Sequence, residues 1–279
     1  MQPLIHKIFE SDFFELINFQ CQCNICAESK RVYNHKFSIS FISRGNFYYH
    51  TFCEQLDAYT GYALISKPDY EYRVTHPTEE ADECSVFSFS LDFYKSLEEQ
   101  LPYNTKWFFN NKDIQSMLIK LTPEIEYLHK VCIHAIENNM PALYVDALVI
   151  EIVQQLLQSL NQETTQIIVS DRLKKSHIIT IELAKNYILQ NFTTDISLKD
   201  IAAHSFVSPF HFSRIFKTIT GTSPYNYLQT IRLAQASLLL KSNKTIAEAA
   251  FASGFNRLDY FSAAFKQKYK VSPSSFSKK

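Results

Sequence analysis

Three cysteines stand within a run of six residues near the start of the chain, Cys21-Gln-Cys23-Asn-Ile-Cys26. Thiolates this close together can bind a soft metal ion or undergo reversible oxidation. Further ligands could come from the same half of the chain if the fold brings them near: Cys53, Cys84, His50 and His76. The alternative is that the cysteines are small apolar residues of the core. The sequence therefore leaves two interpretations open, a thiolate-bound metal with Cys84 as a further thiol, and plain core packing.

A second set of side chains suited to chemistry lies on a predicted helix that begins near residue 209. Its buried stripe follows the i, i+3, i+4, i+7 spacing: Phe212, Ile215, Phe216 and Ile219. The opposite face then carries Phe210, His211, Ser213, Arg214, Lys217 and Thr218. An arginine such as Arg214 can donate two hydrogen bonds to guanine, and a lysine such as Lys217 can reach a phosphate. The pattern predicts binding to double-stranded DNA, with an ordinary solvated helix surface as the alternative.

The same pattern occurs a second time, 49 residues further along the chain. The shift takes Phe212 to Phe261 and Pro224 to Pro273. A near-repeat of this length indicates one structural unit used twice. In the second copy the exposed residues are Leu258, Asp259, Ser262, Ala263, Lys266 and Gln267, a set poorer in base-reading groups.

Each copy is predicted to form a helix, a turn and a second helix, over 197–220 and 245–270. The first helix of each pair opens with capping-box spacing: Ser197 with Asp200, and Thr245 with Glu248. Gly221 is predicted to end the second helix of the first pair in a left-handed conformation, and Lys270 takes its place in the second pair. Such a pair of helices places its second helix in the major groove of DNA. The helix between the pairs, about 18 residues and about 27 Å long, could hold the two recognition helices about 34 Å apart, which is one DNA turn.

These residues resemble the AraC/XylS family of bacterial transcription regulators over about residues 176–278. The matching stretches are "IAAHSFVSPFHFSRIFKTITGTSPYNYL", "IRLAQASLLL" and "TIAEAAFASGFNRLDYFSAAFKQKYKVSPSSF". The resemblance implies two helix-turn-helix units joined by a long helix, a cupin-like ligand-binding barrel, homodimerisation, and RNA polymerase as a partner. It also implies base contacts by these residues: Phe210, Ser213 and Arg214 on the first recognition helix, and Leu258, Asp259 and Ser262 on the second. Arg257 and Ala263 depart from the acid and the arginine common in the family, which predicts weaker base reading by the second helix.

The N-terminal half has the alternating and β-branched runs of short strands over residues 35–91, such as "HKFSISF" and "CSVFSFSL". We expect a small β-barrel over about residues 1–92, helices over about 113–160, and a linker over 161–175. An apolar stripe with Leu148, Ile152, Leu156 and Leu160 could pair two subunits or pack on the barrel. The predicted fold class is α+β, with a sensor and dimerisation domain over 1–160 and an all-α DNA-binding domain over 176–279.

Charge divides the chain in the same way. Residues 1–171 hold 12 basic and 23 acidic side chains, a net charge of −11, and residues 172–279 hold 16 and 5, a net charge of +11. A basic domain suits a polyanion such as DNA, and Lys217, Arg257 and Lys266 belong to the candidate DNA-binding set. No leader peptide or membrane-spanning run is evident, so we expect a cytoplasmic protein with no membrane partner.

Three functions are consistent with these features. The favoured one is a sequence-specific transcription regulator, not an enzyme, whose N-terminal domain senses an unidentified small molecule or metal. The second is a cupin-type metalloenzyme tethered to DNA, which the absence of the histidine-rich cupin motif disfavours. The third is an architectural DNA-binding protein without sequence preference, which the sensor-sized N-terminal half disfavours.

Overall fold

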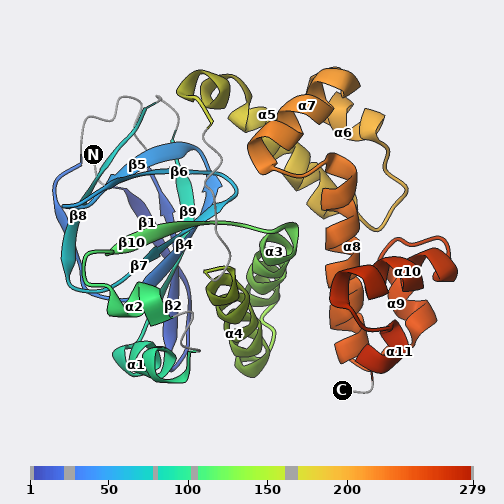
Figure 1. The fold of residues 1–279 in the computed structure, drawn as a ribbon, viewed down its shortest axis with the longest axis horizontal. Coiled ribbons are helices and arrows are strands. Elements are labelled where there is room, and N and C mark those ends of the chain that lie inside the picture. The colour runs from blue at the N-terminus through green and yellow to red at the C-terminus, as the bar shows by residue number, and fades with distance from the viewer. Residues whose placement is uncertain (1–2, 22–28, 78–80, 102–105, 161–168, 278–279) are drawn as a thin grey trace. The chain divides into compact units, whose positions relative to one another are not determined.

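The computed structural model describes residues 3–21, 29–77, 81–101, 106–160 and 169–277 (Figure 1). The chain divides into two compact units, Met1–Ile179 and Thr180–Lys279, called here the N-terminal and the C-terminal unit. The first is rich in strands and the second is helical, which confirms the α+β prediction.

The N-terminal unit contains two antiparallel sheets. The six-stranded sheet has the order β1 (Leu4–Glu10), β2 (Phe14–Gln20), β9 (Glu83–Phe89), β4 (Ser38–Arg44), β7 (Tyr62–Ser66), β10 (Ser116–Lys120). The four-stranded sheet has the order β3 (Val32–Asn34), β8 (Tyr70–Thr75), β5 (Asn46–His50), β6 (Gln55–Tyr59). Neither sheet closes on itself within the described residues, so the structure shows no closed barrel.

Aromatic side chains fill the core of this unit. Phe37, Phe41, Phe87 and Phe89 are almost completely buried. The rings of Phe37 and Phe89 pack together, as do those of Phe41 and Phe87, and Phe14 contacts both pairs. Phe41 and Phe87 belong to the neighbouring strands β4 and β9, which pair in antiparallel register. Burial of such rings is the main stabilisation available to a small β-rich unit.

The described residues of the N-terminal unit also form helices α1 (Leu91–Gln100), α2 (Lys106–Asn110), α3 (Pro123–Glu137) and α4 (Ala142–Ser159). Helices were predicted over about 113–160, and this is wrong at its start, where Ser116–Lys120 form strand β10. The reason is tertiary, because β10 extends the sheet by pairing with β7. The predicted apolar stripe of α4 is buried.

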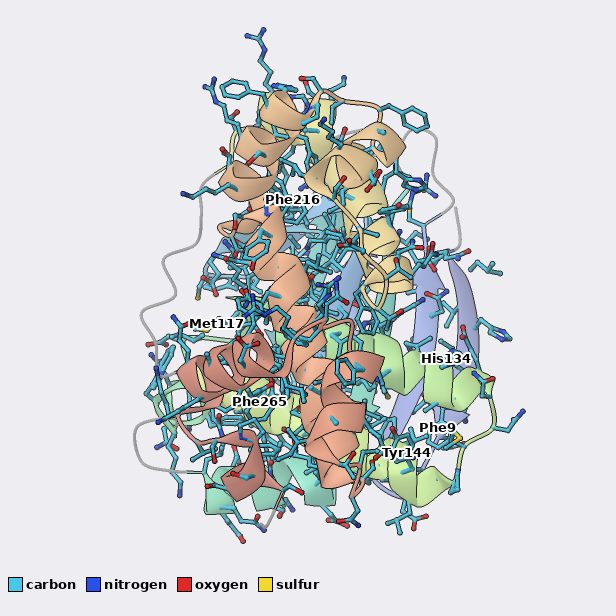
Figure 2. All side chains as sticks on the ribbon, turned by 90° about the vertical axis from the view of Figure 1, so that its right-hand side faces the viewer. Phe9, Met117, His134, Tyr144, Phe216 and Phe265 are labelled. Carbon is cyan, nitrogen blue, oxygen red and sulfur yellow. The ribbon has the colours of Figure 1, made fainter. Side chains whose placement is uncertain are left out.

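Helix α5 (Asp171–Asn191) begins in the N-terminal unit and ends in the C-terminal unit. It starts inside the predicted linker 161–175, of which residues 161–168 lie outside the described part of the chain. The remaining helices are α6 (Leu198–His204), α7 (Pro209–Thr220), α8 (Pro224–Lys241), α9 (Ile246–Ala252), α10 (Leu258–Tyr269) and α11 (Pro273–Phe276). Figure 2 labels Phe216 and Phe265, which lie near opposite ends of α8.

Candidate nucleic-acid interface

The first helix-turn-helix unit consists of α6 and α7. Ser197 and Asp200 form the predicted capping box: the Ser197 hydroxyl accepts from the Asp200 amide, and the Asp200 carboxylate accepts from the Ser197 amide at 2.8 Å. Pro209 occupies the first turn of α7. Ser208 stands at the N-cap of α7, a residue type that commonly caps helices, but its side chain makes no capping hydrogen bond there. Gly221 ends α7 in the predicted left-handed conformation, with φ of 74°.

The side chains of α7 separate into a buried face and an exposed face, as the spacing of its apolar residues predicts. The four apolar residues of the predicted stripe are buried. Phe210, His211, Arg214 and Lys217 are exposed, and Ser213 is half-buried. Thr218 is exposed as well, so the structure leaves none of the six residues predicted for this face fully buried.

The turn between α6 and α7 adds a residue that the sequence reasoning missed. Phe206 adopts φ of 59°, which is uncommon for a non-glycine residue, and its ring is 86% exposed. Phe210, in the first turn of α7, is equally exposed at 86%. The repeat gave a misleading signal, because its 49-residue shift aligns Phe206 with Phe255, which is buried. Exposed aromatic rings such as these two can contact bases, because apolar contact with thymine methyl groups is part of base readout.

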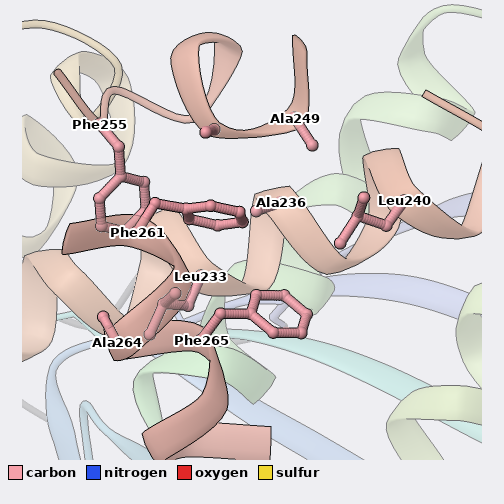
Figure 3. Packing of buried hydrophobic residues seen from close by; sticks show 9 residues of the cluster. Leu233, Ala236, Leu240, Ala249, Phe255, Phe261, Ala264 and Phe265 are labelled. Carbon is pink, nitrogen blue, oxygen red and sulfur yellow. The ribbon is translucent and has the colours of Figure 1, made fainter. Parts of the chain in front are cut away.

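The second helix-turn-helix unit consists of α9 and α10 and has a core of its own. Phe261 and Phe265 from α10 pack with Ala249 from α9 and with Leu233 and Leu240 from α8 (Figure 3). Thr245 and Glu248 form the second predicted capping box. Each helix-turn-helix unit thus has a small core of its own, and one end of α8 contributes side chains to each core.

The solvent side of α10 carries an ion pair at its start. The guanidinium of Arg257 donates to both carboxylate oxygens of Asp259, with Nε to Oδ1 at 3.1 Å and Nη2 to Oδ2 at 2.5 Å. This contact lowers the pKa of Asp259 below its ordinary value. Leu258 and Lys266 are exposed and Ser262 is half-buried. An arginine held by a carboxylate has fewer donors left for another partner.

Polar contacts fix α10 against α8. The hydroxyls of Tyr225 and Tyr260 are hydrogen-bonded to each other, and Gln229 Nε2 donates to the Tyr260 hydroxyl at 2.6 Å. Helix α8 has 18 residues, or about 27 Å at 1.5 Å per residue. It makes an aromatic contact with α7 through Tyr227 and Phe216, whose ring centroids are 5.5 Å apart. The same helix therefore packs against both recognition helices.

The predicted thiols are placed only in part. Cys23 and Cys26 lie outside the described residues. Cys84 is buried in β9, and burial raises the pKa of its thiol well above the ordinary value. Cys21 is also buried, directly after β2. Cys84 is not among the residues whose ligand atoms gather around Cys21.

Comparison with known proteins agrees with this geometry. A family model described as a helix-turn-helix domain matches residues 201–279. The regulatory protein PocR of Salmonella typhimurium is 33% identical over 101 residues, which are 36% of this chain and 33% of PocR. The transposon Tn10 TetD protein of Escherichia coli is 30% identical over 104 residues, which are 37% of this chain and 75% of TetD.

This chain belongs to the AraC/XylS family. The family prediction made from the doubled motif is thereby confirmed. The chain spans only about a third of the length of PocR. Among solved structures, unsaturated fatty acid-bound ToxT of Vibrio cholerae is 15% identical, with 96% of this chain and 95% of that chain covered and a TM-score of 0.39. In the part of this chain that the structure describes, no helix is both long and apolar enough to cross a membrane.

Proposed function

We propose that this AraC/XylS family member regulates transcription by binding a specific sequence of double-stranded DNA through α7 and α10. The observation that carries the proposal is the exposed face of α7, where Phe210, Arg214 and Lys217 stand on a helix whose other face is fully buried. The net charge of +11 over residues 172–279 supplies the attraction to phosphate. Helix α7 reads bases and α10 contributes less to binding, because Asp259 occupies Arg257.

The N-terminal unit is proposed to sense an effector, to pair two chains, and to pass the signal to RNA polymerase. Pairing is supported by apolar side chains on the solvent side of α4, namely Leu143, which is 80% exposed, Tyr144 and Ile150. Isolated exposed apolar residues are ordinary, but Leu143 and Ile150 are seven apart and share one helix face. In sedimentation equilibrium we expect a homodimer, and Ile150→Glu should shift it to monomer. A monomer in both cases would remove dimerisation from the proposal.

The test of DNA reading compares Arg214→Ala with Lys199→Ala. Both remove one exposed positive charge from the first helix-turn-helix unit, but Lys199 lies on α6. The preferred site is first selected from random duplexes with the full chain. Arg214→Ala should then lose about 1–3 kcal/mol on that site and much less on random DNA. Lys199→Ala should weaken both equally. Equal losses on the two duplexes for Arg214→Ala would mean that Arg214 contacts only phosphate.

A further inference from the structure

Three potential metal ligands gather where the two sheets of the N-terminal unit approach each other. They are Cys21, His76 and Asp82, and their ligand atoms all lie within 4.8 Å of one another. Cys21 directly follows β2, Asp82 directly precedes β9, and these strands end in the register pair Gln20 and Glu83. His76 directly follows β8 of the other sheet. Pairing of β2 with β9 therefore sets two of the ligands side by side, and the second sheet supplies the third.

Main-chain contacts hold the first two ligands in place. The amide of Cys21 donates to the main-chain oxygen of Asp82 at 2.9 Å. Gly45, between β4 and β5, packs directly on Asp82, since a Cβ at Gly45 would lie 2.8 Å from the Asp82 Cα. The position of Asp82 thus depends on a glycine that leaves it room.

The cluster is buried and polar. The side chains of His76 and Asp82 are 9% and 4% exposed, and Cys21 is 8% exposed. Nε2 of His76 and Oδ1 of Asp82 are 2.5 Å apart, while Nδ1 of His76 is buried and has no hydrogen-bond partner among the described residues. A buried carboxylate and an unpaired imidazole nitrogen are both costly, and a bound cation removes both costs.

We propose that Cys21, His76 and Asp82 bind a divalent metal ion of the zinc class. Thiolate, imidazole and carboxylate are the ligands of Zn²⁺, whereas Mg²⁺ and Ca²⁺ prefer oxygen alone. Zinc–ligand bonds of about 2.0–2.3 Å place tetrahedral ligands about 3.3–3.7 Å apart, and small side-chain rotations bring atoms within 4.8 Å to that spacing. Three protein ligands leave a fourth position for water or a further ligand. The site lies in the N-terminal unit, and the proposal that it binds metal does not depend on whether the protein binds DNA.

This site differs from the thiol cluster that the sequence suggested. The thiol cluster would bind through Cys21, Cys23, Cys26 and Cys84, with His76 as one possible further ligand, and would not need Asp82. The proposed site needs both His76 and Asp82 and does not use Cys84. Substitution of Asp82 therefore distinguishes the two sites.

The experiment uses the full chain, purified with reductant and stripped with a chelator. Zn²⁺ is titrated in competition with a chromophoric chelator, and Co²⁺ is added separately to record the thiolate-to-metal charge-transfer band. Wild type should bind one Zn²⁺ tightly and show the band. His76→Gln, Asp82→Asn and Cys21→Ser should each weaken Zn²⁺ binding by at least about 100-fold, because loss of even an outer-shell partner costs 10–100-fold. Cys21→Ser should also abolish the cobalt band.

Two controls lie outside the cluster, Cys53→Ser and His50→Gln, and both should bind Zn²⁺ as wild type does. Thermal unfolding gives a second readout, since Zn²⁺ should raise the melting temperature of wild type and the controls but not of the three ligand variants. Circular dichroism establishes that each variant is folded. The proposal is overturned if wild type binds no Zn²⁺, or if His76→Gln and Asp82→Asn bind it unchanged.

Discussion

Arg232 Nε donates a hydrogen bond of 2.7 Å to the main-chain oxygen of Phe192, which ties α8 to the chain just beyond α5. The same guanidinium donates from Nη2 to the oxygen of Thr194, also at 2.7 Å. Gly254, in the turn of the second helix-turn-helix unit, lies against this contact, since a Cβ there would be 2.7 Å from the Phe192 oxygen. One arginine thus satisfies two carbonyls where a helix ends, and a glycine gives it room.

Arg232→Lys should destabilise the C-terminal unit, because an ammonium cannot reproduce the two-pronged contact. We expect a loss of about 1.5–3 kcal/mol in the free energy of unfolding, the usual value of hydrogen bonds to a charged group. Urea unfolding followed by far-ultraviolet circular dichroism measures it. Arg214→Lys, on exposed α7, is the matched control and should change stability by less than about 0.5 kcal/mol. Equal stability of the two variants would show that Arg232 is not a structural contact.

Asp259→Asn should strengthen binding to random DNA, because it removes a negative charge from α10 and releases Arg257. If Arg257 then reaches one more phosphate, the slope of log K against log salt concentration should steepen by about 1. Filter binding over a range of salt concentrations measures the slope. Asp195→Asn removes an equal charge from the exposed segment between α5 and α6 and should leave the slope unchanged. An unchanged slope in Asp259→Asn would mean that Arg257 does not face DNA.

Lys270→Gly should stabilise the C-terminal unit. Lys270 ends α10 with φ of 62°, the conformation that Gly221 adopts at the end of α7. A side chain costs energy there that glycine does not, so we expect a gain of about 0.5–1 kcal/mol. Lys270→Ala removes the charge but keeps a Cβ and should give no gain. A gain in both variants would trace the effect to charge instead of backbone conformation.

Local signals explain why so much of the C-terminal unit could be predicted. These signals are local, because each depends on residues within a few positions of the helix end or face that it defines. They are the capping boxes at Ser197 and Thr245, the helix-ending glycine Gly221, and the helical spacing of apolar residues. The N-terminal unit depends on distant pairings instead. Strand β10 forms by pairing with β7 at the edge of the sheet. This pairing depends on residues far away in the sequence, so the five residues of β10 did not by themselves predict a strand. Asp82 was missed as a ligand for the same reason, because only the pairing of β2 with β9 brings it to Cys21.

The last prediction concerns the pH dependence of stability. His129 lies on α3 with its ring stacked on Phe41, at 4.2 Å between centroids and 3° between planes. Burial, with a smaller effect of Lys130, lowers the pKa of His129 from 6.5 to about 3. The folded protein therefore keeps this imidazole neutral in a range where the unfolded chain takes up a proton. The contribution of this neutral imidazole to the free energy of unfolding is complete above about pH 6.5 and is lost as pH falls toward about 3.

Between pH 7 and pH 5 wild type should lose about 2 kcal/mol in unfolding free energy relative to His129→Gln, which cannot take up that proton. Trp107, the single tryptophan of the chain, lies in the N-terminal unit and reports its unfolding by fluorescence. Replacing a buried ring destabilises the variant by the same amount at every pH. The informative quantity is therefore how the difference in unfolding free energy between wild type and His129→Gln changes with pH. His134→Gln, which removes an exposed histidine of the same helix, is measured beside it for comparison. If the His129→Gln difference does not change between pH 7 and pH 5, the imidazole is not held neutral by burial, and acid sensitivity of the N-terminal unit has another origin.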